Sequence, residues 1–175
     1  MCVFYKSSKK MSNVESVIQI SKKLGSILKV QRKTLGVAES CTGGLLCKTV
    51  TDVPGSSSYF LGGVVSYSNT VKEGILKIDR DSLMNFGAVS EVVALKMARG
   101  AKNVVDADVA IAITGVAGPE GGSKDKPVGT VYIAWDTRAV LEAKRYDFGG
   151  LDRRKIQGLS VFSAIVGLIE RLQTP

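Results

Sequence analysis

The chain of 175 residues contains no histidine, and this absence limits its chemistry more than any other property of its composition. Histidine is the usual base that activates a serine or cysteine nucleophile. In this chain such a nucleophile needs a different base, and lysine is the usual substitute. A serine or cysteine nucleophile here therefore predicts a lysine partner.

Cysteines and long apolar runs are scarce as well. Cys2, Cys41 and Cys47 are odd in number and suggest no disulfide framework. Because histidine and cysteine clusters are absent, the donor set that zinc prefers is missing, and we expect no metal site. No apolar run approaches the roughly 20 residues that cross a bilayer, and Met1–Lys10 lacks the apolar segment of a signal peptide. We therefore expect a cytoplasmic protein with no membrane partner.

The net charge of +8 raises the question of nucleic-acid binding, and its distribution argues against it. Residues 1–33 carry eight basic side chains and one acidic side chain, whereas the remainder carries 16 basic and 15 acidic ones. The excess charge lies on an N-terminal tail and one helix, where a solvated face is the ordinary interpretation. Few aromatic residues accompany these lysines, so we do not expect nucleic acid as a partner.

The order of elements predicts an α/β fold, a three-layer α/β/α sandwich with a mixed sheet of about five strands. We expect residues 1–12 to be a disordered leader and residues 13–175 to form a single domain. The predicted helices are Asn13–Val30, Gly43–Thr51, Thr70–Leu76, Ser82–Phe86, Glu91–Val105 and Asp152–Leu172, with Asn69, Asp81 and Ser90 as three of the N-caps. The predicted strands are Thr34–Ala38, Phe60–Tyr67, Asp108–Thr114, Gly129–Trp135 and Val140–Phe148.

Ser40 is the first candidate for a catalytic residue, because it lies on a predicted strand-to-helix turn. Backbone N–H groups converge on such a turn and the helix dipole adds positive charge, so a developing oxyanion can be stabilised there. A plain helix-capping role for Ser40 is equally compatible with the sequence. Cys41 is a competing nucleophile, although without histidine a buried, inert thiol is the simpler interpretation.

Lys72 is the candidate base, because it falls at the start of a predicted helix after Ser66–Asn69. The positive end of a helix, together with burial, lowers the pKa of a lysine and lets it act as a general base. A solvated lysine is the ordinary alternative. The glycine-rich segment Thr114–Ser123 can present N–H groups to an anion. It matches neither a P-loop nor a dinucleotide fingerprint, and a simple turn-rich loop also explains it.

Together these segments resemble the CinA C-terminal domain family, also known as the nicotinamide-nucleotide amidohydrolase PncC. The resemblance covers about residues 13–172. It rests on Ala38–Gly44, Val53–Ser57, Gly62–Asn69 with Lys72, Gly87–Glu91, Thr114–Gly122 and Lys126–Tyr132, which follow one another in the family's order and spacing.

The resemblance implies an enzyme that converts nicotinamide mononucleotide to nicotinate mononucleotide and ammonia without a cofactor. Ser40 would be the nucleophile, Lys72 its base, and Tyr67 would lie between them to orient the proton transfer. For substrate binding it implies Thr42, Gly43, Thr114, Gly115 and an arginine for the phosphate, which we place at Arg153.

Two departures from the family pattern fall near that arginine. The segment Phe148–Arg154 is one residue longer, so Arg154 is an alternative to Arg153, and Gln157 stands where an arginine is common. The family is also associated with competence and DNA damage, which leaves a catalytically silent nucleotide- or partner-binding domain as the alternative function. From the general frequency of symmetric dimers among small enzymes, we expect a homodimer.

Overall fold

The computed structural model describes residues 13–173, which form helices and one five-stranded sheet. The expected leader, residues 1–12, lies outside the described residues. The helices are α1 (Asn13–Val30), α2 (Leu45–Thr51), α3 (Asn69–Gly74), α4 (Arg80–Phe86), α5 (Glu91–Val104) and α6 (Arg153–Gln173), with a short 3-10 turn η2 (Ser56–Ser58). The strands are β1 (Leu35–Glu39), β2 (Phe60–Val65), β3 (Val109–Gly115), β4 (Thr130–Asp136) and β5 (Leu141–Asp147).

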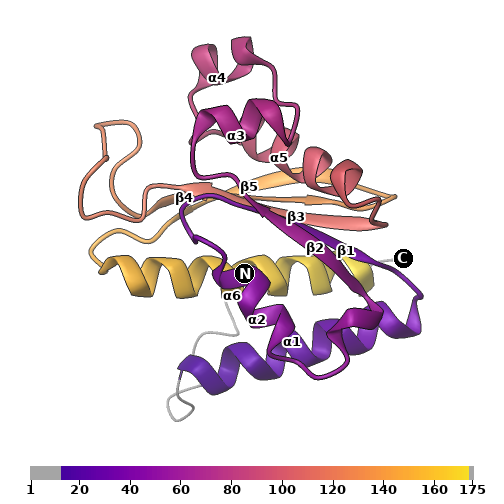
Figure 1. Ribbon diagram of the computed structural model, residues 1–175. Helices are drawn as coiled ribbons and strands as arrows, with labels where there is room; N and C mark the ends of the chain where they lie inside the picture. The colour runs from indigo at the N-terminus through magenta and orange to yellow at the C-terminus, as the bar shows by residue number, and fades with distance from the viewer. Residues whose placement is uncertain (1–12, 174–175) are drawn as a thin grey trace.

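The five strands form one mixed sheet in the order β2-β1-β3-β4-β5. The strands β2, β1 and β3 run parallel, and β4 and β5 are antiparallel to their neighbours. Helices α1, α2 and α6 lie on one side of the sheet, and α3, α4 and α5 on the other (Figure 1). The predicted three-layer fold with a mixed sheet is confirmed. Among the described residues, no helix is long and apolar enough to cross a membrane.

The two faces of the sheet differ in side-chain size, and this explains the packing of its layers. Strand β3 alternates Ala110 and Ala112 with Ile111 and Ile113, all fully buried. The alanines face α5, whose own buried surface is rich in alanine, so this helix packs closely on the sheet. The isoleucines join Trp135 in the larger core beneath α1, α2 and α6.

Two of the predicted helix caps are wrong by one or two residues. Ser68, rather than Asn69, accepts a hydrogen bond from Val71 N and begins α3. Asp79, rather than Asp81, accepts from Ser82 N and begins α4. The prediction of Ser90 as the cap of α5 is confirmed. Each of these short helices follows more than one residue that is able to cap a helix. The sequence alone does not show which of them accepts the hydrogen bond from the first turn.

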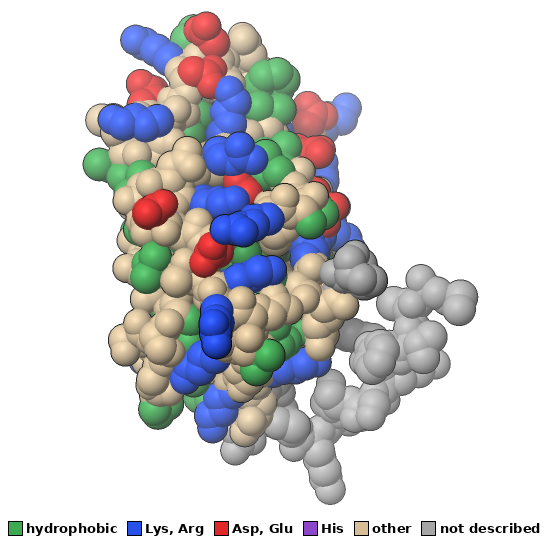
Figure 2. All heavy atoms as spheres, turned by 90° about the vertical axis from the view of Figure 1, so that its right-hand side faces the viewer, with side chains coloured by type: hydrophobic (Ala, Val, Ile, Leu, Met, Phe, Trp, Pro, Cys, Tyr) green, Lys and Arg blue, Asp and Glu red, His purple; other side chains and the backbone are tan. Residues whose placement is uncertain are grey.

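A band of lysine and arginine side chains crosses the side of the molecule shown in Figure 2, with a few acidic side chains among them. Part of the basic charge is paired within the fold. Arg99 and Lys102 both contact the carboxylate of Asp136, which has no exposed surface. Arg138 lies 3.6 Å from Asp108. These contacts join α5 and the β4–β5 turn to the sheet, so part of the positive charge stabilises the fold.

Candidate active site

The turn after β1 places Ser40 at the carboxyl end of the sheet. Ser40 N donates to Ile113 O at 2.9 Å, which extends the β1–β3 pairing by one residue. Gly43 and Gly44 then take φ values of +62° and +99°, which favour glycine, and the chain enters α2. Helix α2 begins at Leu45 rather than at the predicted Gly43. The two glycines therefore shape the turn that presents Ser40.

Glu39 is a member of the site that the motif analysis did not single out. Its side chain is completely buried, and its carboxylate accepts hydrogen bonds from the amides of Gly44, Leu46 and Cys47 at 2.8–3.1 Å. The amides of Gly44, Leu46 and Cys47 are therefore occupied by Glu39 and are not free to bind a substrate. In the described part of the chain, the amides of Cys41 and Thr42 donate to no other residue, and these are the candidate oxyanion donors.

Lys72 reaches Ser40 directly. Its side chain is 1% exposed, and Nζ lies 3.2 Å from Ser40 Oγ and 2.5 Å from Ser66 O. No carboxylate among the described residues pairs with this amine. Burial lowers the pKa of Lys72 below its ordinary value, while the nearby Cys41 acts in the opposite direction. The alternative of a solvated lysine is therefore excluded by its position, which only the folded chain reveals.

Tyr67 does not lie between Ser40 and Lys72. Its side chain is 63% exposed, and its hydroxyl accepts a hydrogen bond from Arg153 Nη2 at 3.3 Å. The sequence-based expectation of an intermediary is wrong in this respect, because Lys72 is long enough to reach Ser40 from the first helix after β2. Tyr67 instead belongs to the rim of the site, next to an arginine.

A cavity of about 270 Å³ opens beside the Ser40–Lys72 pair. It brings together predicted site residues from the three separate segments of the sequence, together with Arg153. Its lining includes Ser40, Cys41, Tyr67, Lys72, Ala88, Val89, Thr114, Gly115, Val116, Ala117, Gly118, Glu120, Gly121 and Arg153. The cavity therefore joins the ends of β1 and β3 to the start of α6.

The remaining predicted binding residues occupy different positions. Thr114 and Gly115 line the cavity, and Thr114 Oγ1 donates to Ala88 O at 2.8 Å. Thr42 and Gly43 are not part of its lining: Thr42 is buried and Gly43 is exposed. A role for Thr42 through its backbone amide remains compatible with this position.

Arg153 is the arginine of the cavity. Its Nη1 donates to Gly118 O at 2.7 Å, and with the bond to Tyr67 it connects three chain segments at the rim. Arg154 is exposed and does not line the cavity. Gln157, one turn further along α6, donates from Nε2 to Cys41 O at 2.8 Å and so holds the turn that carries Ser40.

The two described cysteines have the properties of inert thiols. Burial raises the pKa of Cys41 to about 12. Burial and the neighbouring carboxylate of Glu39 also raise the pKa of Cys47. The thiolate is the nucleophilic form, so Cys41 is a poor competitor for Ser40 at neutral pH. Among the described residues, no three histidine, cysteine or acidic side chains are grouped to hold a metal ion.

The family model of the CinA C-terminal domain matches residues 17–172. The chain belongs to the CinA C-terminal domain family. A CinA-like protein of Geotalea uraniireducens is 51% identical over 139 residues, which are 79% of this chain and 33% of that protein. A putative competence-damage inducible protein of Moorella thermoacetica is 51% identical over 141 residues, 81% of this chain and 34% of that protein. The chain thus spans about a third of the length of these relatives.

Solved structures show the same fold for other CinA-family proteins. The crystal structure of the competence/damage inducible protein CihA from Agrobacterium tumefaciens is 35% identical with a TM-score of 0.88, covering 91% of this chain and 96% of that one. A CinA superfamily protein from Escherichia coli is 33% identical with a TM-score of 0.86, covering 98% and 99%. The solved chains in these two structures are therefore close in length to the present chain.

Proposed function

We propose that this CinA C-terminal domain is an amidohydrolase that converts nicotinamide mononucleotide to nicotinate mononucleotide and ammonia. The observation that carries the proposal is the buried amine of Lys72, 3.2 Å from the hydroxyl of Ser40 in a cavity that also contains an arginine. A lysine without a carboxylate partner and with a lowered pKa has the properties of a general base.

In the first step, neutral Lys72 accepts the proton of the Ser40 hydroxyl while Oγ attacks the carbonyl carbon of the carboxamide. Neutral Nζ can donate to Ser66 O while its lone pair accepts from Ser40 Oγ. In this scheme the amides of Cys41 and Thr42 stabilise the oxyanion of the tetrahedral intermediate. Lys72 then donates its proton to the amide nitrogen, the C–N bond breaks, and ammonia leaves an ester on Ser40.

In the second step, water hydrolyses that ester. Lys72 takes a proton from the water as the new C–O bond forms, and returns it to Ser40 Oγ as the acyl bond breaks. The net reaction consumes one amide and one water and gives one carboxylic acid and one ammonia. Neither histidine nor a redox group is needed for this sequence.

Arg153 is the proposed contact for the substrate phosphate. A guanidinium carries five N–H donors, and here two hydrogen bonds, to Gly118 and Tyr67, fix its orientation. The remaining N–H groups can donate to two oxygens of one phosphate, which favours arginine over lysine in this role. Tyr67 therefore supports the substrate-binding arginine in this scheme.

The alternative is a nucleotide- or partner-binding domain without catalytic activity. The names of several relatives refer to competence or damage inducibility and to no reaction. Such a domain has no need for an amine buried against a serine hydroxyl, and for this reason the amidohydrolase is the better supported function.

The test is to measure ammonia and nicotinate mononucleotide formed from nicotinamide mononucleotide, with a metal chelator present throughout. We expect turnover by the native chain and a loss by a factor of about 100 to 10,000 or more in Ser40→Ala and Lys72→Ala. Lys23→Ala, an exposed lysine on α1, is the matched control and should keep full activity. Nucleotide binding without turnover by the native chain would instead support the binding domain.

A further inference from the structure

Gln157 on α6 forms a hydrogen bond to the turn that carries the candidate nucleophile. Its Nε2 donates to Cys41 O at 2.8 Å, although the two residues are 116 positions apart in the sequence. Gln157 is partly buried, and Cys41 is 5% exposed. The bond therefore fixes the direction of one peptide group in the turn.

This turn is tight, because Gly43 N donates to Ser40 O at 3.1 Å. Cys41 and Thr42 are its two central residues, and the peptide group between them is the one whose reversal converts a type I turn into a type II turn. A type II turn requires a positive φ at its third residue, which a β-branched residue avoids. Thr42 holds that place, and its φ is not positive. The peptide group between Cys41 and Thr42 therefore has one orientation in this turn.

The carbonyl of Cys41 and the N–H of Thr42 belong to this same peptide group. A trans peptide is planar, so the two bonds point in opposite directions. Because Cys41 O points to Gln157, Thr42 N–H points away from that side chain. Cys41 lines the cavity, and the nitrogen of Thr42 is bonded to its carbonyl carbon. Thr42 N–H donates to no other described residue. A hydrogen bond to a carbonyl also polarises the N–H of the same peptide, so Gln157 both directs this donor and strengthens it.

We propose that Gln157 is a positioning residue for the oxyanion of the amidohydrolase reaction. It acts through the Thr42 amide and does not touch the substrate, because Gln157 is not part of the cavity lining. This role rests on the proposed function, since an oxyanion forms only when Ser40 attacks a carbonyl group. Arg153 lies one turn earlier on α6, so one helix carries both the proposed phosphate contact and the support of the oxyanion donor.

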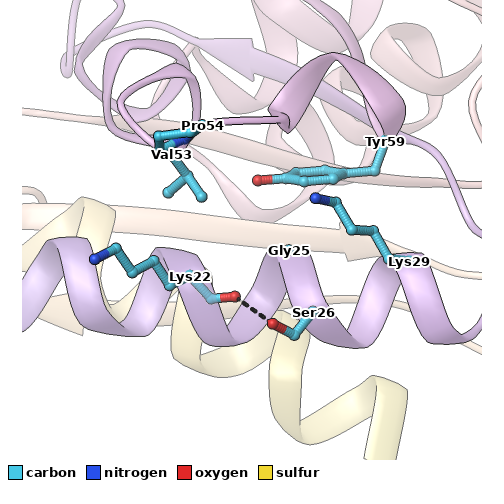
Figure 3. A pocket seen from close by; sticks show the side chains of 7 residues that line it. All are labelled: Lys22, Gly25, Ser26, Lys29, Val53, Pro54 and Tyr59. Atoms are coloured by element: carbon cyan, nitrogen blue, oxygen red, sulfur yellow. Dashed lines mark hydrogen bonds between the residues drawn. The ribbon is translucent and has the colours of Figure 1, made fainter.

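A matched hydrogen bond elsewhere in the fold separates positioning from simple stabilisation. Gln31 Nε2 donates to Leu172 O at 2.7 Å, so it also joins distant segments through a glutamine and a backbone carbonyl. Leu172 lies about 22 Å beyond Gln157 along α6. Gln31 follows Lys29, which Figure 3 shows beside Tyr59. Tyr59 O accepts from the first residue of β1, whereas the nucleophile turn follows the last one. Gln31 is therefore a control of the same bond type at the other end of the strand.

The first measurement is steady-state deamidation of nicotinamide mononucleotide, at a pH above the ionisation of Lys72. Gln157→Leu and Gln157→Glu have no N–H to donate, and each should lower kcat about 10- to 100-fold, because outright loss of an oxyanion donor costs about 100- to 1,000-fold. KM should change by less than about threefold, since the ground state has no oxyanion. Gln157→Arg restores N–H donors and should recover most of kcat. Gln31→Leu should keep the native kcat, although its melting temperature falls as that of Gln157→Leu does.

A second measurement does not depend on the identity of the substrate. An alkyl fluorophosphonate reacts with an activated serine: Ser40 Oγ bonds to phosphorus, fluoride leaves, and Lys72 takes the hydroxyl proton. Negative charge develops on the phosphoryl oxygen, so the reaction needs the oxyanion donors but no recognition of a nucleotide. Intact-mass spectrometry gives the rate of labelling. We expect this rate to fall about 10- to 100-fold in Gln157→Leu, to stay native in Gln31→Leu, and to be zero in Ser40→Ala.

The two measurements distinguish failure of the substrate from failure of the positioning role. Labelling of Ser40 without deamidation would remove the proposed substrate, and the relative labelling rates would then decide the role of Gln157. That role is overturned by native rates in Gln157→Glu, by an equal loss of rate in Gln31→Leu, by a change confined to KM, or by a Gln157→Arg variant no faster than Gln157→Leu. A native chain that neither deamidates the nucleotide nor is labelled at Ser40 would overturn both proposals.

Discussion

Replacement of Glu39 by glutamine tests how the nucleophile turn is held. In the native chain one carboxylate oxygen accepts from Gly44 N and Leu46 N, and the other accepts from Cys47 N. Glutamine has nearly the same shape but only one acceptor oxygen. It can keep the two bonds to Gly44 and Leu46, and its NH₂ group then faces the amide of Cys47.

The magnitude follows from these contacts. A buried amide left without an acceptor costs about 1–3 kcal/mol. Loss of a negative charge at the start of a helix costs about 0.3–1 kcal/mol, and up to about 2 kcal/mol in a partly buried position. We therefore expect Glu39→Gln to lower the free energy of unfolding by about 2–4 kcal/mol, a large share of the roughly 5–15 kcal/mol that is typical of a domain.

Urea denaturation followed by circular dichroism measures this difference, with Glu91→Gln as the matched control. Glu91 lies in the first turn of α5 but is exposed, so its charge contributes to the helix dipole without buried hydrogen bonds. The control should lose less than about 1 kcal/mol. A Glu39→Gln variant within 0.5 kcal/mol of the control, at an unchanged denaturant slope, would refute this account of the turn.

Three further predictions follow from other parts of the structure. Because burial lowers the pKa of Lys72 and the base must be neutral, kcat/KM should rise with pH through an ionisation below the ordinary lysine value, and a pH–rate profile flat from pH 6 to 10 would contradict the role of Lys72. Cys41 and Cys47, whose pKa values are raised by burial, should react with iodoacetamide at pH 7.5 far more slowly in the native chain than in the unfolded one, as followed by peptide mass spectrometry. Gly167→Ala should destabilise the fold by about 1–3 kcal/mol, because its Cβ would lie 2.2 Å from the ring of Trp135. Tryptophan fluorescence during denaturation measures that loss, and a neutral effect would show that α6 can move outward without cost.

Much of the fold could be predicted because its signals are local. The continuous apolar run in Asp108–Thr114 predicted a buried strand, and the structure places β3 at the centre of the sheet. The short connection near Asp136–Ala139 predicted the antiparallel pair β4–β5. Both predictions depend only on residues close together in the sequence. They therefore hold for any arrangement of the layers.

The site was less predictable because its decisive contacts join residues far apart in the chain. Ser40 and Lys72 could be named as candidates, but the 3.2 Å between them depends on how β1 and β2 pair. Glu39 follows the predicted strand Thr34–Ala38 and was given no role, since no short motif shows that a carboxylate will bond to the amides of the helix that follows its strand. The position of Tyr67 depended on Arg153, 86 residues further along the chain.

The two edges of the sheet differ in their resistance to strand addition. Edge strand β5 carries Glu142, Lys144 and Arg145, and charges of this kind discourage pairing with another chain. Edge strand β2, with the sequence Phe-Leu-Gly-Gly-Val-Val, carries no charge, and Leu61 and Val65 are nearly half exposed. Within the sheet β2 pairs only with β1, the strand that ends at Glu39. A variant with weakened pairing between β1 and β2 exposes the uncharged strand β2 first. Aggregation of such a variant should therefore begin at β2, and Leu61→Lys or Val65→Lys should suppress it.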